Sequence, residues 1–224
     1  MSDPAAPPGP SQPAVDETHS VVKAAGLIGV ATFSSRILGF VRDMVLARLF
    51  GATPAADAFF VAYRVPNLLR ELFAEGSMSA AFIPVFTEYH TLKAKRDAWE
   101  LASATFTTLL TIVTAVTLIG ILAAPGIVWI LAPGFRESVD KLALTTLLTQ
   151  LMFPYLIFIS LAALAMGILN SLRDFAAPAF SPVFFNIFTI ACMLFLSPWL
   201  SEPIIAVAIG IVVGGLAQFA MQLP

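Results

Sequence analysis

The chain contains 224 residues, of which 58% are hydrophobic and 12% are charged, and its mean hydropathy is +0.89. Soluble domains are about 45–50% apolar and about 25% charged, so this composition excludes a soluble globular protein and indicates an integral membrane protein. The formal net charge of −2 gives no basic field for binding nucleic acid, and a single cysteine, Cys192, excludes an intrachain disulfide.

The first 19 residues, MSDPAAPPGPSQPAVDETH, are polar and rich in proline and contain no lysine or arginine. A secretory signal needs a basic start followed directly by an apolar core, and this stretch has neither. We therefore predict a disordered tail over residues 1–19 and a transmembrane unit over residues 20–224.

The apolar segments begin at Val21. A first helix is predicted at about 21–50, ended by Gly51, and the short loop that follows predicts an antiparallel second segment at about 55–91. That second segment is expected to be broken, because proline removes a backbone donor and clashes with the preceding turn. The interruptions are Pro66, Gly76 and Pro84.

Four further apolar runs follow a basic loop. Each is long enough to cross a bilayer, which requires about 20 residues of helix. The sequence therefore predicts an all-α integral membrane protein with six spans. Gly210 and Gly214 form a GxxxG pattern, which predicts a helix-packing face. The later helices are predicted at about 98–133, 138–172, 176–198 and 203–224.

Basic residues in the loops predict the orientation. Placing the amino terminus in the cytoplasm puts more lysine and arginine on the cytoplasmic side, as the positive-inside rule requires. The inner set is then Lys23, Lys93, Lys95, Arg96 and Arg173, and the outer set is Arg136 and Lys141.

The stretch from residue 35 to 76 carries an unusual number of charges for a membrane segment. Each charge buried in hydrocarbon costs roughly 2.5–3.5 kcal/mol on insertion scales, so these side chains are expected to face a shared, wet interior. That interior is the candidate functional site. The charges are Arg36, Arg42, Asp43, Arg48, Asp57, Arg64, Arg70, Glu71 and Glu75.

Helix geometry relates the first of these charges to one another. At about 100° per residue, Arg36 and Asp43 fall on nearly the same face, and Arg42 lies about 120° from Arg36. Arg36 and Arg42 can therefore flank a groove. Glu71 and Glu75 are four residues apart and could pair with arginines of the first helix.

Arginine is an informative choice at such a site. Its planar fork stays charged and holds phosphate or carboxylate through two parallel hydrogen bonds, so the cluster suits a diphosphate or another polyanion. The alternative is that the charges only lock two helices together or reach an interface, which is favoured for Arg48 and Arg64 alone. Neither His19 nor His90 resembles a metal ligand, and no cofactor motif occurs.

Two motifs resemble a known family. SRILGFVRD at 35–43, with LFGATPAADAFFVAYRVPNLLRELFAEGSMSAAFIPVFTEY at 49–89, resembles the MurJ (MviN) family, the flippases for lipid II. APG at 132–134 and FAAPAFSPVFFNIFTI at 175–190 extend the resemblance. It implies a multidrug/oligosaccharidyl-lipid/polysaccharide exporter-like fold with two lobes around a cationic cavity, of which this chain is the amino-terminal lobe.

The resemblance also implies roles for single residues. Arg36, Arg42 and Arg70 match arginines that face the cavity, and Asp43 matches an acid that accompanies the second of them. Arg64 and Glu71 are counted as supporting charges, together with Asp57 and Glu75, which match family charges. The implied activity is translocation of lipid II by alternating access across the bacterial cytoplasmic membrane, a transport role in peptidoglycan biosynthesis and not an enzymatic one.

Family members are about twice as long as this chain. The second lobe is therefore expected to be absent, so that the chain is a fragment or is completed by another polypeptide. Two alternatives remain open from the residues: an exporter of another polyprenyl-linked glycan or an amphipathic drug, and a non-transporting membrane scaffold.

Overall fold

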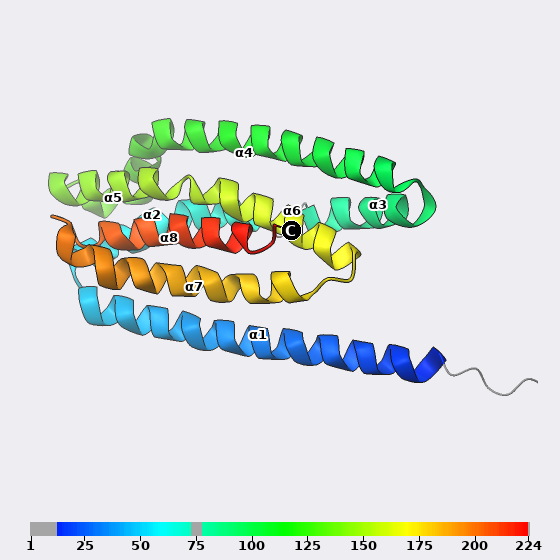
Figure 1. Ribbon diagram of the computed structural model, residues 1–224. Helices are drawn as coiled ribbons and strands as arrows, with labels where there is room; N and C mark the ends of the chain where they lie inside the picture. The colour runs from blue at the N-terminus through cyan, green and yellow to red at the C-terminus, as the bar shows by residue number, and fades with distance from the viewer. Residues whose placement is uncertain (1–12, 73–77, 224) are drawn as a thin grey trace, which may run out of the picture.

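The computed structural model describes residues 13–72 and 78–223, which are mostly helical and contain no strand in those ranges. Short turns and two single-turn 3₁₀ helices connect the α-helices (Figure 1). The elements are α1 (Pro13–Phe50), α2 (Pro54–Arg70), α3 (Met78–Leu92), α4 (Lys95–Leu131), η2 (Pro133–Phe135), α5 (Val139–Met152), α6 (Tyr155–Ser171), α7 (Ala176–Leu196), η3 (Ser197–Trp199) and α8 (Ile205–Ala220).

The helices run side by side, with α1 and α4 on opposite sides of the bundle (Figure 1). Helix α1 packs against α7, α7 packs against α8, and α8 packs against α6. Helix α2 packs against α5, while α3, α4 and α6 form a second contact group. Helices α1 and α2 are therefore consecutive in the chain, yet each is held mainly by a different partner.

The turn between α1 and α2 follows directly from its sequence. Gly51 has a φ of +54°, a left-handed conformation that glycine adopts without strain, and its N–H donates to the carbonyl of Ala47 at 2.9 Å. Thr53 then caps α2, since its hydroxyl oxygen accepts from the Ala56 N–H at 3.3 Å. Pro54 occupies the first turn, where a missing N–H does no harm.

The prolines act differently from one another. Pro66 lies inside α2 and Pro84 lies inside α3, so neither ends its helix. One proline removes a single backbone bond, and a span whose other backbone groups need partners stays helical around it. Pro154 does separate two helices: α5 ends at Met152 and α6 begins at Tyr155, where the sequence predicted one helix over 138–172.

The amino-terminal part of α1 also differs from expectation. The helix begins at Pro13, so residues 13–19 are helical although the sequence predicted a disordered tail through residue 19. Proline is compatible with a first helical turn, and no glycine or further proline follows before Gly26. The rest of the predicted tail, residues 1–12, lies outside the described residues, as do Glu75 and the predicted interruption at Gly76.

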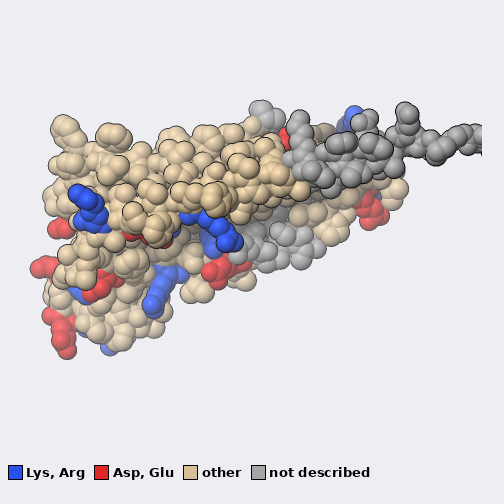
Figure 2. All heavy atoms as spheres, turned by 90° about the horizontal axis from the view of Figure 1, so that it is seen from below, with Lys and Arg blue, Asp and Glu red and all other residues tan. Residues whose placement is uncertain are grey.

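Within the described part of the chain, four helical stretches are long and apolar enough to cross a membrane. The face in Figure 2 is largely uncharged, with most charged side chains at one end, a smaller mixed group partway along and a few toward the opposite end. The predicted number of six spans and the predicted orientation stay predictions. The four stretches are Ala25–Phe50, Lys95–Leu131, Val139–Ser171 and Ala176–Trp199.

Close packing joins α7 to α8, as the GxxxG pattern predicted. A Cβ atom added to Gly210 would lie 3.1 Å from the Thr189 carbonyl oxygen, and one added to Gly214 would lie 2.8 Å from that of Phe185. Because lipid tails are as apolar as side chains, helices in a bilayer associate through such close contact. The predicted packing face is confirmed, and it forms the wall behind the candidate site.

Candidate functional site

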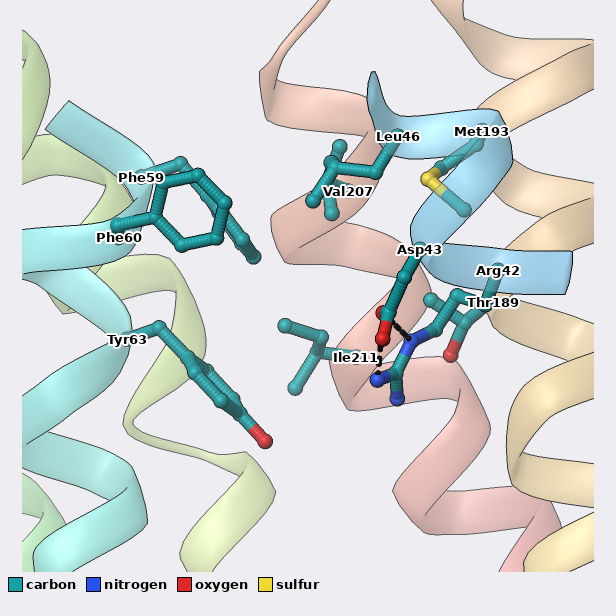
Figure 3. Close-up of a pocket in the computed structure, with 10 residues that line it drawn as sticks. All are labelled: Arg42, Asp43, Leu46, Phe59, Phe60, Tyr63, Thr189, Met193, Val207 and Ile211. Carbon is teal, nitrogen blue, oxygen red and sulfur yellow. Dashed lines mark hydrogen bonds and ion pairs between the residues drawn. The ribbon is translucent and has the colours of Figure 1, made fainter. Parts of the chain in front are cut away.

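A small cavity of about 80 Å³ lies where α1 and α2 face each other in front of α7 and α8. Arg42 and Asp43 reach it from α1, and aromatic side chains of α2 lie opposite them (Figure 3). We call this the Arg42 cavity. Its lining is Arg42, Asp43, Leu46, Phe59, Phe60, Tyr63, Thr189, Met193, Val207 and Ile211.

Arg42 is held by fixed partners on two helices. Its Nε and Nη2 atoms donate to Oδ1 of Asp43 at 3.1 and 2.8 Å, and its Nη1 atom donates to Oδ1 of Asn186 at 3.3 Å. The guanidinium carbon lies 5.9 Å from the centre of the Phe185 ring. With a side-chain exposure of 31%, Arg42 is partly shielded and pointed in a defined direction.

Asn186 was not singled out from the sequence, yet its amide joins α7 to α1. Its Nδ2 atom donates to the carbonyl of Ser35 at 3.2 Å and to that of Pro182 at 3.1 Å, while Oδ1 accepts from Arg42. Gly39 lies beside this amide, and a Cβ added there would be in ordinary contact with it at 3.8 Å. A buried amide in an otherwise apolar span is a signal that could have identified Asn186.

A second, larger cavity of about 380 Å³ lies between α2, α6, α7 and α8. We call this the Arg70 cavity. Tyr63 lines both cavities, and Phe185 lines this one while also lying beside the Arg42 guanidinium. The two arginines therefore face neighbouring spaces divided by aromatic side chains. The polar lining residues are Tyr63, Asn67, Arg70, Tyr155, Gln218 and Gln222.

Arg70 lies in a short network along α2. Its Nε atom donates to Oδ1 of Asn67 at 3.1 Å, and Nδ2 of Asn67 donates to Oε1 of Glu71 at 3.1 Å. Nη2 of Arg70 is 4.0 Å from the same Glu71 oxygen. The contacts of Glu71 therefore lie within α2, whereas the sequence suggested pairing with an arginine of α1.

The remaining predicted charges lie outside these two cavities. Arg36 and Arg64 are exposed, and neither lines the Arg42 or the Arg70 cavity. Asp57 accepts from Nζ of Lys141 at 2.8 Å, which ties α2 to α5. Over the described residues, no group of three or more His, Cys, Asp or Glu side chains is positioned to hold a metal ion.

Fold and site together define a class: a multi-pass α-helical membrane protein with arginine-lined cavities between its helices, the arrangement in which transporters carry their binding sites. The family model described as "Lipid II flippase MurJ" matches residues 46–224. The chain therefore belongs to the MurJ family of lipid II flippases. Arg36, Arg42 and Asp43 precede the matched residues.

Individual relatives agree with this assignment. A probable lipid II flippase MurJ of Vibrio cholerae is 43% identical over 220 residues, covering 94% of this chain and 41% of the relative. The lipid II flippase MurJ of Burkholderia cenocepacia is 40% identical over 193 residues, covering 86% of this chain and 37% of the relative.

A solved structure is similar as well. It is a lipid II flippase MurJ in an inward closed conformation, with 32% identity and a TM-score of 0.70, covering 87% of this chain and 40% of that one. The chain thus spans between 37% and 41% of the length of these three proteins. The family and the apolar helices identify a bacterial inner-membrane protein.

Proposed function

We propose that this chain forms the amino-terminal lobe of a flippase that carries lipid II, the undecaprenyl-diphosphate-linked precursor of peptidoglycan, across the cytoplasmic membrane. The proposed role is transport and not catalysis. In this proposal Arg42 and Arg70 bind the diphosphate, Asp43 orients Arg42, and Arg36 contributes positive charge from the exposed side of α1.

The observation that carries the proposal is the position of two arginines in adjoining cavities. Arg42 and Arg70 come from different helices, and Tyr63 lines the space in front of each. A diphosphate has two charged groups and a guanidinium fork binds one such group through parallel hydrogen bonds, so two forks in neighbouring spaces suit it.

The arrangement also suits a site that changes its access. Asp43 and Asn186 keep Arg42 in place without substrate, so little side-chain freedom is lost when the anion arrives. The walls come from α1, α7 and α8 on one side and α2 on the other. Movement of α1 with α7 relative to α2 would open or close the space in front of Arg42, as alternating access requires.

A scaffold role is the competing hypothesis, and the contacts of Arg42 are the observation that favours it, because its donors already have protein partners. The accessibility of position 70 to a water-soluble reagent distinguishes the transport hypothesis from the scaffold hypothesis. In a Cys192→Ser background, Arg70→Cys should react with a water-soluble maleimide if the Arg70 cavity is hydrated. Protection of that cysteine in the native protein, with labelling only after denaturation, would favour the scaffold.

The transport role can be tested by fusing this chain to the carboxy-terminal portion of the Vibrio cholerae relative and expressing the fusion in cells depleted of their own flippase. Growth is expected with the unsubstituted fusion and is expected to fail with Arg42→Ala or Arg70→Ala. Each loses hydrogen bonds to a charged group, worth about 1.5–3 kcal/mol, or roughly 10- to 100-fold in affinity.

Arg48→Ala is the matched control, since Arg48 is an exposed arginine of α1 that lines neither cavity. It should support growth. Membrane abundance of every variant is measured by immunoblot, so that a loss of growth is separated from a loss of protein. Normal growth with Arg42 and Arg70 both replaced would refute the proposed function.

A further inference from the structure

The fourth span predicted from the sequence is the one that the structure divides in two. Figure 1 shows α5 and α6 end to end alongside α4, with a short break between them. Pro154 has no N–H for the carbonyl of Gln150. The N–H groups of Leu156 and Ile157 bond to carbonyls three residues earlier instead of four, at 3.0 and 3.1 Å. The α-helical hydrogen-bond ladder is therefore interrupted between two regular helices.

A notch in α4 receives the residue that precedes this proline. Phe153 is only 1% exposed, and its ring occupies the space left by the missing side chain of Gly120. A Cβ atom added to Gly120 would overlap that ring. Beside the notch, the Nε2 atom of Gln150 donates to the carbonyl of Ile121 at 3.1 Å. The break is thus held against α4 at one point, by a ring that meets a helix surface without a side chain.

The two halves of the divided span have different main neighbours. Helix α5 packs mostly against α2, and in its first turn Nζ of Lys141 donates to Asp57 of α2 at 2.8 Å. Helix α6 packs mostly against α8, with further contacts to α3. Both halves also rest on the single long helix α4. Helices α2 and α5 therefore form one packed unit, and α6 belongs to another.

The interruption makes a change of angle between α5 and α6 inexpensive. Sharp bends in helices occur mainly at prolines and similar interruptions, because bending an intact helix disturbs its backbone bonds. The bond at Pro154 is already missing, so a change of angle breaks no further backbone bond there. Helix α5 has 14 residues and is about 21 Å long at 1.5 Å per residue, so a change of about 20° moves its far end by roughly 7 Å.

We propose that the joint at Phe153 and Pro154 is a hinge, about which α2 and α5 swing as one unit relative to α6, with Phe153 turning in the Gly120 notch. The hinge itself is a property of the fold. Its use in transport rests on the proposed function, because Tyr63 and Arg70 lie on α2 and line the cavities. The swing moves these side chains relative to α7 and α8, and α4 is the fixed support.

The test measures distances between pairs of spin labels in the ligand-free 224-residue chain in lipid nanodiscs, in a Cys192→Ser background. Val139→Cys, at the far end of α5, is paired in turn with Ile130→Cys on α4 and with Phe195→Cys on α7, all three at exposed positions. A swing should spread at least one of these two distance distributions by about 3–7 Å. The pair of Val139→Cys and Arg64→Cys lies within the proposed unit and should give one narrow distribution.

Two substitutions should stop the swing. Pro154→Ala restores the missing N–H, and Gly120→Ala places a methyl group in the notch, so each should narrow the broad distribution to the width found within the unit. Pro125→Ala and Gly126→Ala are the matched controls and should change no distribution. Pro125 lies inside α4 without ending it, and nothing lies within 4 Å of a Cβ added to Gly126. Pro154→Ala carries the test if Gly120→Ala lowers the midpoint of thermal unfolding.

The outcomes distinguish the hinge from the proposed function. Narrow distributions for every pair in the unsubstituted chain, or a broad distribution that Pro154→Ala leaves broad, overturn the hinge and leave the proposed function standing. Added undecaprenyl diphosphate should narrow the broad distribution by favouring one angle, and binding without such a change overturns the role of the hinge in transport. If that lipid does not bind, the proposed function fails, while the ligand-free distances still decide the hinge.

Discussion

The two arginine-lined cavities differ in what their arginines already contact. Arg42 faces a space of about 80 Å³, and each of its three donor nitrogens has a partner on α1 or α7. Arg70 faces a space of about 380 Å³, and its Nε atom bonds to Asn67 of its own helix. The same residue type, 28 positions apart in one charged stretch, is thus tied to a second helix in one place and faces a larger cavity in the other.

This difference indicates a division of labour. A fixed guanidinium is suited to a small anion whose position must be defined, because its orientation is set before binding. An arginine beside a roomy, amide-bearing wall is suited to a larger and more variable group. Helix α7 contributes to both cavities, through Thr189 in one and Phe185 in the other. Substitutions at this shared wall therefore test whether the two cavities differ in function.

The largest expected effect comes from Gly214→Leu. A Cβ at this position would lie 2.8 Å from both the Phe185 carbonyl oxygen and Oγ1 of Thr189, so a larger side chain must push α8 away from α7. Overpacking of this kind costs about 1–3 kcal/mol or more, and both cavities should lose their shape. The midpoint of thermal unfolding should fall, and the chain in lipid nanodiscs should no longer bind undecaprenyl diphosphate or lipid II.

Gly126→Leu serves as the control for that substitution, since nothing lies within 4 Å of a Cβ added to Gly126. It should leave the unfolding midpoint and both affinities close to those of the unsubstituted chain. An equal effect at both glycines would show that the α7–α8 contact is not what maintains the cavities.

Asn186→Leu should distinguish the contribution of the Arg42 cavity to binding from that of the Arg70 cavity. It leaves the Ser35 carbonyl and Nη1 of Arg42 without the amide, and an unpaired buried group costs about 1–3 kcal/mol. We expect weaker binding of undecaprenyl diphosphate. In an Arg42→Ala background the same substitution should cause little further loss, because Asn186 acts on the anion through Arg42.

A control for this cycle is Asn170→Leu, at an asparagine near the end of α6 that lines neither cavity. It should be neutral in both backgrounds. Strictly additive losses from Asn186→Leu and Arg42→Ala would contradict a positioning role and would leave only a structural contribution to the α1–α7 contact.

Asp43→Asn should have a smaller effect of the same sign. The Asp43 side chain is 63% exposed, so its pair with Arg42 contributes no more than about 1 kcal/mol to stability. The amide keeps one acceptor for the guanidinium but loses the charge that holds it in place, so affinity for undecaprenyl diphosphate is expected to fall up to about 5-fold in the same binding assay. A rise in affinity would instead show that the carboxylate competes with the anion for Arg42.

The smallest expected effect concerns the ion pair between Asp57 and Lys141, which lies outside both cavities. The Asp57 side chain is 61% exposed, so solvent screens the 2.8 Å contact and its coupling energy should be about 0.2–1 kcal/mol. A double-mutant cycle with Asp57→Asn and Lys141→Met, followed by thermal unfolding, measures it. Lipid binding should not change, and a change would extend the site toward α5.

The sequence by itself determined the class of protein and the location of the candidate site along the chain. A composition of 58% hydrophobic residues requires a bilayer, and charges in such a chain are too costly to be incidental. Gly51 and Thr53 fixed the turn between α1 and α2 through local chemistry, and Gly210 with Gly214 indicated the packing face on α8. These features depend on neighbours within a few residues, so a local pattern is sufficient.

Only the tertiary structure decided which charges face a cavity and what holds them there. Helical periodicity made Arg36 and Arg42 equally good candidates for lining a cavity. Packing of α1 on α7 instead leaves Arg36 exposed and turns Arg42 toward Asn186, 144 residues away in sequence. Gln218 of α8 and Gln222, just after its end, line the Arg70 cavity for the same reason. A contact between distant segments depends on how whole helices pack, and no local pattern encodes that.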